Sequence, residues 1–147
     1  MKKAGRAALT ILLLLILLAG IYAAYVFLAW YRVEDRQTLE IDTLGGGAEG
    51  ELSTGARYRI ASYNIGFGAY SADYSFFMDG GDSSRALSPD AVRENVGGAV
   101  EAVQSLRPHF LFLQEVDTYG TRSYHIDELE LAGQGLHQDF LHRTFAQ

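Results

Sequence analysis

The sequence contains no cysteine among its 147 residues. This absence excludes disulfide bonds, thiolate nucleophiles and zinc sites built on cysteine. Basic residues are also few, with 12 Lys and Arg against 18 Asp and Glu, and the formal net charge is −6. Three of the basic residues (Lys2, Lys3 and Arg6) lie in the first six positions, so the remainder is strongly acidic. This balance argues against binding to a nucleic-acid backbone, although bound metal ions could supply the missing positive charge.

Charge is absent altogether from residues 7–31, which form one apolar run. As a helix, this run would reach ~37 Å, enough to cross a hydrocarbon core of about 30 Å. Basic residues precede it, and Trp30 and Arg32 stand at its far end, as at a membrane interface. We therefore predict that residues 1–32 are a single-pass anchor in the cell membrane, with a cytoplasmic N-terminus and an extracytoplasmic C-terminal domain. The alternative is a cleaved signal peptide, whose apolar region is normally shorter, about 7–15 residues.

The rest of the chain is predicted to be a linker followed by one α/β domain. Residues 33–57 are predicted to form a juxtamembrane linker with a short strand near 39–43. The domain, residues 58–147, is predicted to contain strands at 58–65, 110–114 and 140–146 and helices at 88–106 and 124–136. A long aromatic-rich loop joins the first strand to the first helix. Its aromatic side chains either cover the core or form a lid or a membrane-facing lip.

The helix at 88–106 has the clearest pattern. Ser88 is suited to cap it and Pro89 suits the first turn. One face carries apolar residues at helical spacing: Val92, Val96, Ala99, Val100, Val103 and Leu106. The strand that follows, Phe110–Gln114, is almost continuously apolar, which predicts burial on both faces.

Two polar residues are expected to meet at one edge of the sheet. The order strand, helix, strand predicts a crossover between parallel strands, whose carboxyl ends lie at the same edge. Asn64 lies near the end of the first strand and Glu115 directly follows the second. An amide and a carboxylate together suit a hard cation such as Mg²⁺. The simpler alternative is that Asn64 forms a turn and Glu115 is a solvated loop acid.

Two segments of the domain are Ile60–Ile65 (IASYNI) and Leu111–Asp117 (LFLQEVD). They resemble the first two motifs of the endonuclease/exonuclease/phosphatase superfamily, which includes DNase I-like nucleases, neutral sphingomyelinases and inositol phosphatases. The loop Gly66–Arg85 and the later Thr121–Glu128 (TRSYHIDE) are similar to a bacterial, membrane-anchored subgroup. The resemblance implies an α/β (α+β) fold, in which the domain is part of a four-layer α/β/β/α sandwich of the DNase I-like type.

The resemblance also implies roles for particular residues. Glu115 matches the glutamate that binds Mg²⁺ or Mn²⁺, and Asn64 matches the asparagine that helps to organise the metal and the scissile phosphate. Gln114 and Asp117 match frequent neighbours with supporting roles. The superfamily often has an aspartate where this chain has His109, which we interpret as a structural residue.

Two further residues follow Glu115 closely enough to reach the same edge. Arg122 is a candidate phosphate clamp, with a surface salt bridge as the alternative. His125 is a candidate proton donor or phosphate contact. A histidine at the start of a helix with no chemical role is the alternative for His125.

These observations predict the N-terminal portion of a membrane-anchored, Mg²⁺-dependent phosphoric-ester hydrolase. Tethering and acidic charge favour a lipid or small phosphoester over nucleic acid as substrate. The later motifs of the superfamily, an Asp-x-Asn segment and a terminal Asp-His pair, do not occur in the sequence. We therefore expect a fragment that binds Mg²⁺ weakly and hydrolyses nothing alone. The alternative is a non-catalytic membrane-anchored scaffold, or a decayed gene product, that keeps part of the fold.

Overall fold

The computed structural model describes residues 2–45 and 50–146, and the predicted linker residues at 46–49 lie outside this description. The chain is a mixed structure of helix and sheet, 42% helical and 13% strand. It separates into two compact units, Met1–Thr38 and Leu39–Gln147. The second unit begins within the segment predicted as a linker, because strand β1 (Ile41–Thr43) belongs to it.

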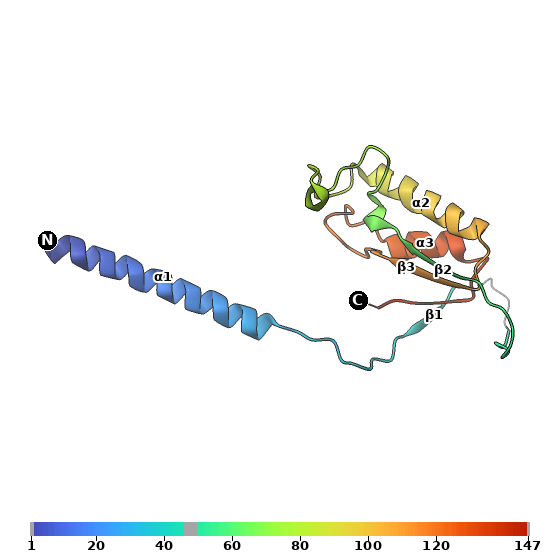
Figure 1. Ribbon diagram of the computed structural model, residues 1–147, viewed down its shortest axis with the longest axis horizontal. Coiled ribbons are helices and arrows are strands. Elements are labelled where there is room, and N and C mark those ends of the chain that lie inside the picture. Colours follow the sequence, from blue (N-terminus) through green and yellow to red (C-terminus); the bar gives the residue numbers. More distant parts are fainter. Residues whose placement is uncertain (1, 46–49, 147) are drawn as a thin grey trace. The chain divides into compact units, whose positions relative to one another are not determined.

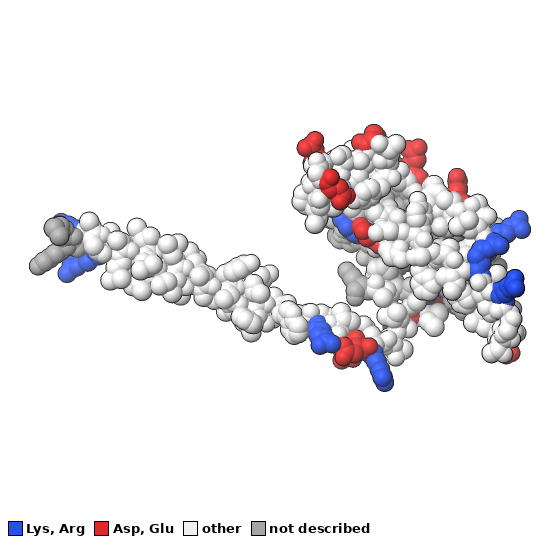
Figure 2. Space-filling model, in the orientation of Figure 1, with Lys and Arg blue, Asp and Glu red and all other residues white. Residues whose placement is uncertain are grey.

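The first unit is dominated by helix α1, Lys2–Ala29. Within Lys3–Ala29, an 18-residue stretch reaches a mean hydropathy of 2.8, and none of that stretch is buried. The helix is therefore long and apolar enough to span a membrane, as predicted. It ends at Ala29, so Trp30 follows the helix. Figure 2 shows its uncharged surface between basic residues near the start and the charged residues after its end.

The second unit is organised around two parallel strands, β2 (Ile60–Asn64) and β3 (Phe110–Gln114). They pair in register, with Ile60 opposite Phe110 and Asn64 opposite Gln114. Helix α2, Pro89–Ser105, crosses between them. Ser88 caps α2, as predicted, by accepting a hydrogen bond of 3.0 Å from the backbone N–H of Ala91. The predicted crossover between parallel strands is confirmed.

The core lies between these strands and two helices, α2 and α3 (Glu128–Leu136), which lie on the same face of the pair (Figure 1). The predicted apolar face of α2 supplies five of the eleven buried hydrophobic residues in the described chain: Val92, Val96, Ala99, Val100 and Val103. Leu106 was also predicted on this face, but it is 52% exposed. It is the C-cap residue, one position beyond the last residue of the helix.

The prediction that β3 is buried on both faces is wrong. Leu111 and Leu113 pack against the core, whereas Phe110, Phe112 and Gln114 are exposed. Alternate residues of a strand point to opposite faces, and the described part of the chain places helices over only one of them. The observed fold is therefore a layer of helices on a two-stranded parallel sheet.

Helix α3 begins four residues later than predicted. Tyr124 and His125 have φ angles of 57° and 59°, in the left-handed region, which a helix cannot include. Asp127 is the N-cap, and its side chain accepts a hydrogen bond of 2.9 Å from the backbone N–H of Glu130. The predicted short strands at the two ends of the unit are confirmed as β1 (Ile41–Thr43) and β4 (His142–Thr144), which pair antiparallel.

The aromatic loop between β2 and α2 contains two short 3₁₀ helices, η1 (Gly66–Gly68) and η2 (Phe77–Asp79). Phe67 is only 1% exposed and packs edge-on or tilted against neighbouring rings: Tyr70, Tyr74 and Phe76. Phe77 and Met78 are exposed instead. The interpretation that the loop aromatics cover the core therefore holds for Phe67. A lid or membrane-facing lip stays a prediction for the exposed part of the loop.

Candidate functional site

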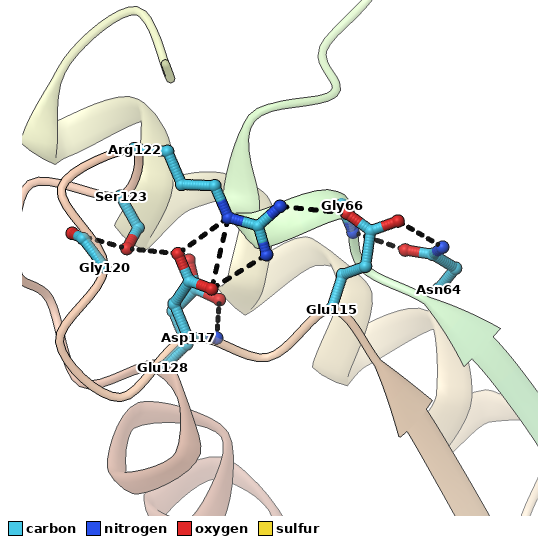
Figure 3. Close-up of polar contacts among 8 residues, drawn as sticks. All are labelled: Asn64, Gly66, Glu115, Asp117, Gly120, Arg122, Ser123 and Glu128. Atoms are coloured by element: carbon cyan, nitrogen blue, oxygen red, sulfur yellow. Dashed lines mark hydrogen bonds and ion pairs between the residues drawn. The ribbon is translucent and has the colours of Figure 1, made fainter. Parts of the chain in front are cut away.

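Asn64 and Glu115 meet at the carboxyl edge of the β2–β3 pair, as predicted. The Asn64 Nδ2 atom donates a hydrogen bond of 2.8 Å to Oε1 of Glu115, although the two residues are 51 positions apart (Figure 3). The parallel register brings them together, because Asn64 pairs with Gln114 and Glu115 comes next. Two segments distant in sequence thus build one polar edge.

The side chain of Asn64 is oriented so that its amide nitrogen donates to Glu115. Its Oδ1 accepts a hydrogen bond of 2.8 Å from the backbone N–H of Gly66, so its amide hydrogens face the carboxylate. The backbone of Glu115 has a φ of 54°, and its carbonyl accepts from the N–H of Phe67 at 2.9 Å. This left-handed residue ends β3, and the Asn64 bond fixes the direction of the carboxylate beyond the strand.

Arg122 joins Glu115 to a second carboxylate, Asp117. Its Nη1 lies 3.4 Å from Oε2 of Glu115. Its Nε and Nη2 both donate to Asp117, at distances of 2.8–3.2 Å. The guanidinium also lies over the Phe67 ring, with Cζ 4.2 Å from the ring centroid. A planar cation held on one face by a ring and on two edges by acids has a fixed orientation.

Asp117 is ionised and firmly held. Burial acts to raise the pKa of Asp117, but hydrogen bonds from Arg122 and Ser123 and the charge of Arg122 outweigh it, so the pKa is lowered. The Ser123 hydroxyl donates to Oδ2 of Asp117 at 2.9 Å. The same pairing raises the pKa of Arg122, so the pair stays charged over the whole ordinary pH range.

Sequence reasoning missed the most deeply buried acid of this region, Glu128. The residue is fully buried, and its Oε2 accepts a hydrogen bond of 2.9 Å from the backbone N–H of Asp117. Its other oxygen, Oε1, is buried and has no hydrogen-bond partner among the described residues. Burial raises the pKa of Glu128 to about 7, the Asp117 N–H opposes this, and the charge of Asp117 adds to it. An acid in the first turn of a helix is typically exposed to solvent, so no local sequence pattern predicts the burial of Glu128.

The remaining predicted residues lie around this site in different ways. Gln114 donates to the Ser62 hydroxyl at 2.7 Å, on the exposed face of the sheet. The Nδ1 atom of His125 lies 3.2 Å from the carbonyl of Tyr119, and the two rings pack 4.4 Å apart. Within the described chain no hydrogen bond links His125 to Glu115 or Arg122. It also precedes α3 by three residues, so it is not a helix-start histidine.

His109 lies at the opposite end of β3. Its Nδ1 accepts a hydrogen bond of 2.9 Å from the backbone N–H of Arg59, and its ring packs edge-on against Tyr58. These contacts join the amino ends of β2 and β3. They support the interpretation of His109 as a structural residue.

Comparisons of the chain with models of protein families, with curated proteins and with solved structures find no match.

Proposed function

We propose that this chain carries the cation- and phosphate-binding edge of a Mg²⁺-dependent phosphoric-ester hydrolase, anchored to a membrane by α1. We further propose that its fold is part of the four-layer α/β/β/α sandwich of the superfamily whose first two motifs it resembles. The main support is one contact. Asn64 in the first motif and Glu115 in the second are 51 positions apart in sequence. The Asn64 Nδ2 atom nevertheless lies 2.8 Å from Oε1 of Glu115, at the carboxyl edge of the β2–β3 pair.

Glu115 has the properties of a cation ligand. Its side chain is 41% exposed, so a hydrated ion can reach it. Asn64 and Arg122 each donate to one of its oxygens, which leaves further lone pairs on both. Mg²⁺ is commonly held by one or two carboxylates, with waters and substrate phosphate completing its shell. When bound, the ion would polarise a phosphoryl oxygen and offset its negative charge. Mn²⁺ suits the same oxygen ligands.

Arg122 is placed to contact a phosphate oxygen. Its guanidinium is next to Glu115 and 38% exposed, and Asp117 fixes its direction. A guanidinium in a fixed orientation binds phosphate oxygens through several N–H groups at once. The salt-bridge alternative and the clamp are thus compatible, because the salt bridge to Asp117 is what holds the clamp in place. A lipid or small phosphoester suits the acidic charge better than nucleic acid does.

Hydrolysis also requires a group that activates water. Among the described residues, His125 is occupied with Tyr119 and does not touch Glu115 or Arg122. We therefore propose that this chain supplies cation and phosphate binding, and that the activating group belongs to the motifs that the sequence does not contain. On this basis Mg²⁺ binding is expected without turnover.

One observation favours the second candidate, a non-catalytic membrane-anchored scaffold. Within residues 2–45 and 50–146 there is no group of three or more His, Cys, Asp or Glu residues that could hold a metal ion. In this alternative the network around Arg122 serves only to fix the loop after β3. The two candidates differ in whether a divalent cation binds at Glu115.

The test is a titration of the full chain in detergent micelles with Mn²⁺, followed by electron paramagnetic resonance. We expect Glu115→Gln to weaken binding about tenfold, since the neutral amide keeps the shape and removes the charge. Glu101→Gln is the matched control, because Glu101 is an exposed acid of α2 away from this edge. If E115Q and wild type bind Mn²⁺ equally, the hydrolase proposal is wrong and the scaffold is favoured.

A further inference from the structure

Glu128 is connected to the candidate site through Asp117 by two reciprocal hydrogen bonds. Its carboxylate accepts from the Asp117 N–H at 2.9 Å, and its own N–H donates to the Asp117 carbonyl at 2.8 Å. These two bonds join the start of α3 to the residue two positions after Glu115. They close the base of the loop that carries Arg122 (Figure 3).

The burial of Glu128 is costly for a purely structural residue. The side chain is fully buried, and no residue in the described part of the chain forms a hydrogen bond with Oε1. A buried acceptor without a partner destabilises the folded chain, because it has given up its hydrogen bonds to water. An acid in the first turn of a helix is ordinarily stabilising when it stays in solvent. A solvated acid at this position would be less costly, but it could not reach the Asp117 N–H.

The packing around Glu128 accommodates the acid closely. A Cβ atom on Gly68 would lie 3.1 Å from Oε1 of Glu128 and 2.8 Å from a methyl group of Val92. Gly68 has a φ of 62°, and its carbonyl accepts a hydrogen bond of 2.9 Å from Asn95. The glycine thus leaves the space that the carboxylate occupies beneath the loop.

The contacts form a continuous series that ends at Glu115. Glu128 holds the backbone of Asp117, the Asp117 carboxylate holds Arg122 through Nε and Nη2, and Arg122 reaches Glu115 at 3.4 Å. Ser123 adds a further bond to Asp117. If the Asp117 backbone were released, its carboxylate could turn to solvent and Arg122 would lose its fixed direction.

We propose that Glu128 is a positioning residue, which holds Asp117 so that Arg122 presents its guanidinium to a phosphate-type oxyanion beside Glu115. This inference rests on the proposed function for its ligand. The link between Glu128 and the orientation of Arg122 can be measured without any ligand.

The first measurement follows the Nε–H signal of Arg122 by ¹⁵N nuclear magnetic resonance of the full chain in micelles. In the wild type the hydrogen bonds to Asp117 should protect this proton from exchange, and Arg122→Lys assigns the signal by removing it. We expect Glu128→Met, which fills a similar volume, to abolish the protection. Glu128→Gln keeps an oxygen acceptor for the Asp117 N–H and should restore it. If Glu128→Met does not fold, Glu128→Asp shortens the side chain by one methylene and should give the same loss.

The second measurement is the affinity for inorganic phosphate at saturating Mg²⁺. Arg122→Ala and Glu128→Met should each weaken it about tenfold, as expected for loss of one charge-assisted contact. Their double variant should be no weaker than either alone, because both act through one guanidinium. A merely structural Glu128 would give additive losses, and Glu128→Gln would not restore affinity.

The two arms separate the possible failures. Wild-type chain that binds no phosphate in the presence of Mg²⁺ contradicts the proposed function, while the Arg122 Nε–H signal still decides the role of Glu128. Unchanged protection of that signal in Glu128→Met, or additive phosphate losses, would overturn the positioning role.

Discussion

The two ends of the β2–β3 pair use polar side chains in opposite ways. At the amino end, His109 accepts from the backbone N–H of Arg59, and the Arg59 guanidinium donates to the carbonyl of Leu106. At the carboxyl end, Asn64 donates to the side chain of Glu115. Each pairing joins residues about fifty positions apart. One end therefore satisfies backbone groups, and the other builds contacts between side chains.

This difference shows which strand-end residues are available for chemistry. A side chain that serves the backbone is fixed by the fold and has few hydrogen-bonding groups left over. Glu115 and Arg122 instead satisfy each other in part and remain 41% and 38% exposed. Charge at a strand end is thus a poor guide to a site unless the partner of that charge is known. The following predictions test whether the two ends are independent.

The largest expected effect is at the carboxyl end, from Gly68→Ala. The added Cβ would stand 2.8 Å from Val92 Cγ1 and 3.1 Å from Glu128 Oε1, at a φ of 62°. Overpacking and the left-handed backbone together should lower the free energy of unfolding by about 2–4 kcal/mol. Thermal unfolding of the full chain in micelles, followed by near-ultraviolet circular dichroism of its tyrosines, measures this loss.

Gly97→Ala is the control for this substitution. Gly97 lies in α2, and a Cβ there meets nothing within 4 Å. Alanine in a helix interior should stabilise by about 0.5–1 kcal/mol. Equal melting temperatures for the two alanine variants would contradict the close packing beneath the carboxyl end.

The second prediction concerns the pH dependence introduced by Glu128. Its pKa of about 7 in the folded chain lies above the ordinary 4.5, so folding holds a proton that the unfolded chain releases. The contribution of Glu128 to stability should then be complete below pH ~4.5 and be lost as the pH rises to about 7, by on the order of 2–3 kcal/mol. Glu128→Gln should remove this decline and be the more stable protein at pH 8. Urea unfolding at pH 5 and pH 8 measures the free energy of unfolding of both proteins. An equal change in this free energy between the two pH values for wild type and Glu128→Gln would contradict the prediction.

The third prediction sharpens the role of Asn64. Asn64→Asp replaces an amide that donates to Glu115 with a second carboxylate, and the repulsion favours a bound cation. Mn²⁺ affinity of the full chain should rise about tenfold. Asn64→Leu removes the donor without adding charge and should lower the affinity. An unchanged affinity in the aspartate variant would contradict cation binding at this edge.

The smallest expected effect is at the amino end. His109→Ala leaves the Arg59 N–H without its acceptor and should cost about 0.5–1 kcal/mol of stability, because the site is exposed to water. Mn²⁺ affinity should not change. A change in affinity comparable to that of Asn64→Leu would show that the two ends are coupled.

Local signals predicted much of the fold. Ser88, Pro89 and the spacing from Val92 to Val103 defined α2 almost to the residue, because caps and helical period are properties of the local chain. The start of α3 was wrong because Tyr124 and His125 adopt left-handed backbone that no residue type there requires. The prediction that β3 is buried on both faces was wrong because an apolar run does not determine which elements cover each face of a strand.

The site was predictable where it depends on topology. Parallel strands necessarily deliver Asn64 and Glu115 to one edge, so strand order sufficed. The contacts of Arg122 with both acids and the burial of Glu128 depend on how the loop after β3 folds back. The sequence pattern does not predict the conformation of this loop.

The sequence by itself determined a helix with an uncharged run long enough to span a membrane, a capped amphipathic helix, and a crossover that brings Asn64 and Glu115 to one edge. These features depend on residue type and short-range spacing. Only the tertiary structure decided that Asn64 turns its amide nitrogen to Glu115, that Asp117 orients Arg122, and that Glu128 is buried. Hydrogen-bond direction and desolvation are set by neighbours distant in sequence, and these exist only once the chain has folded.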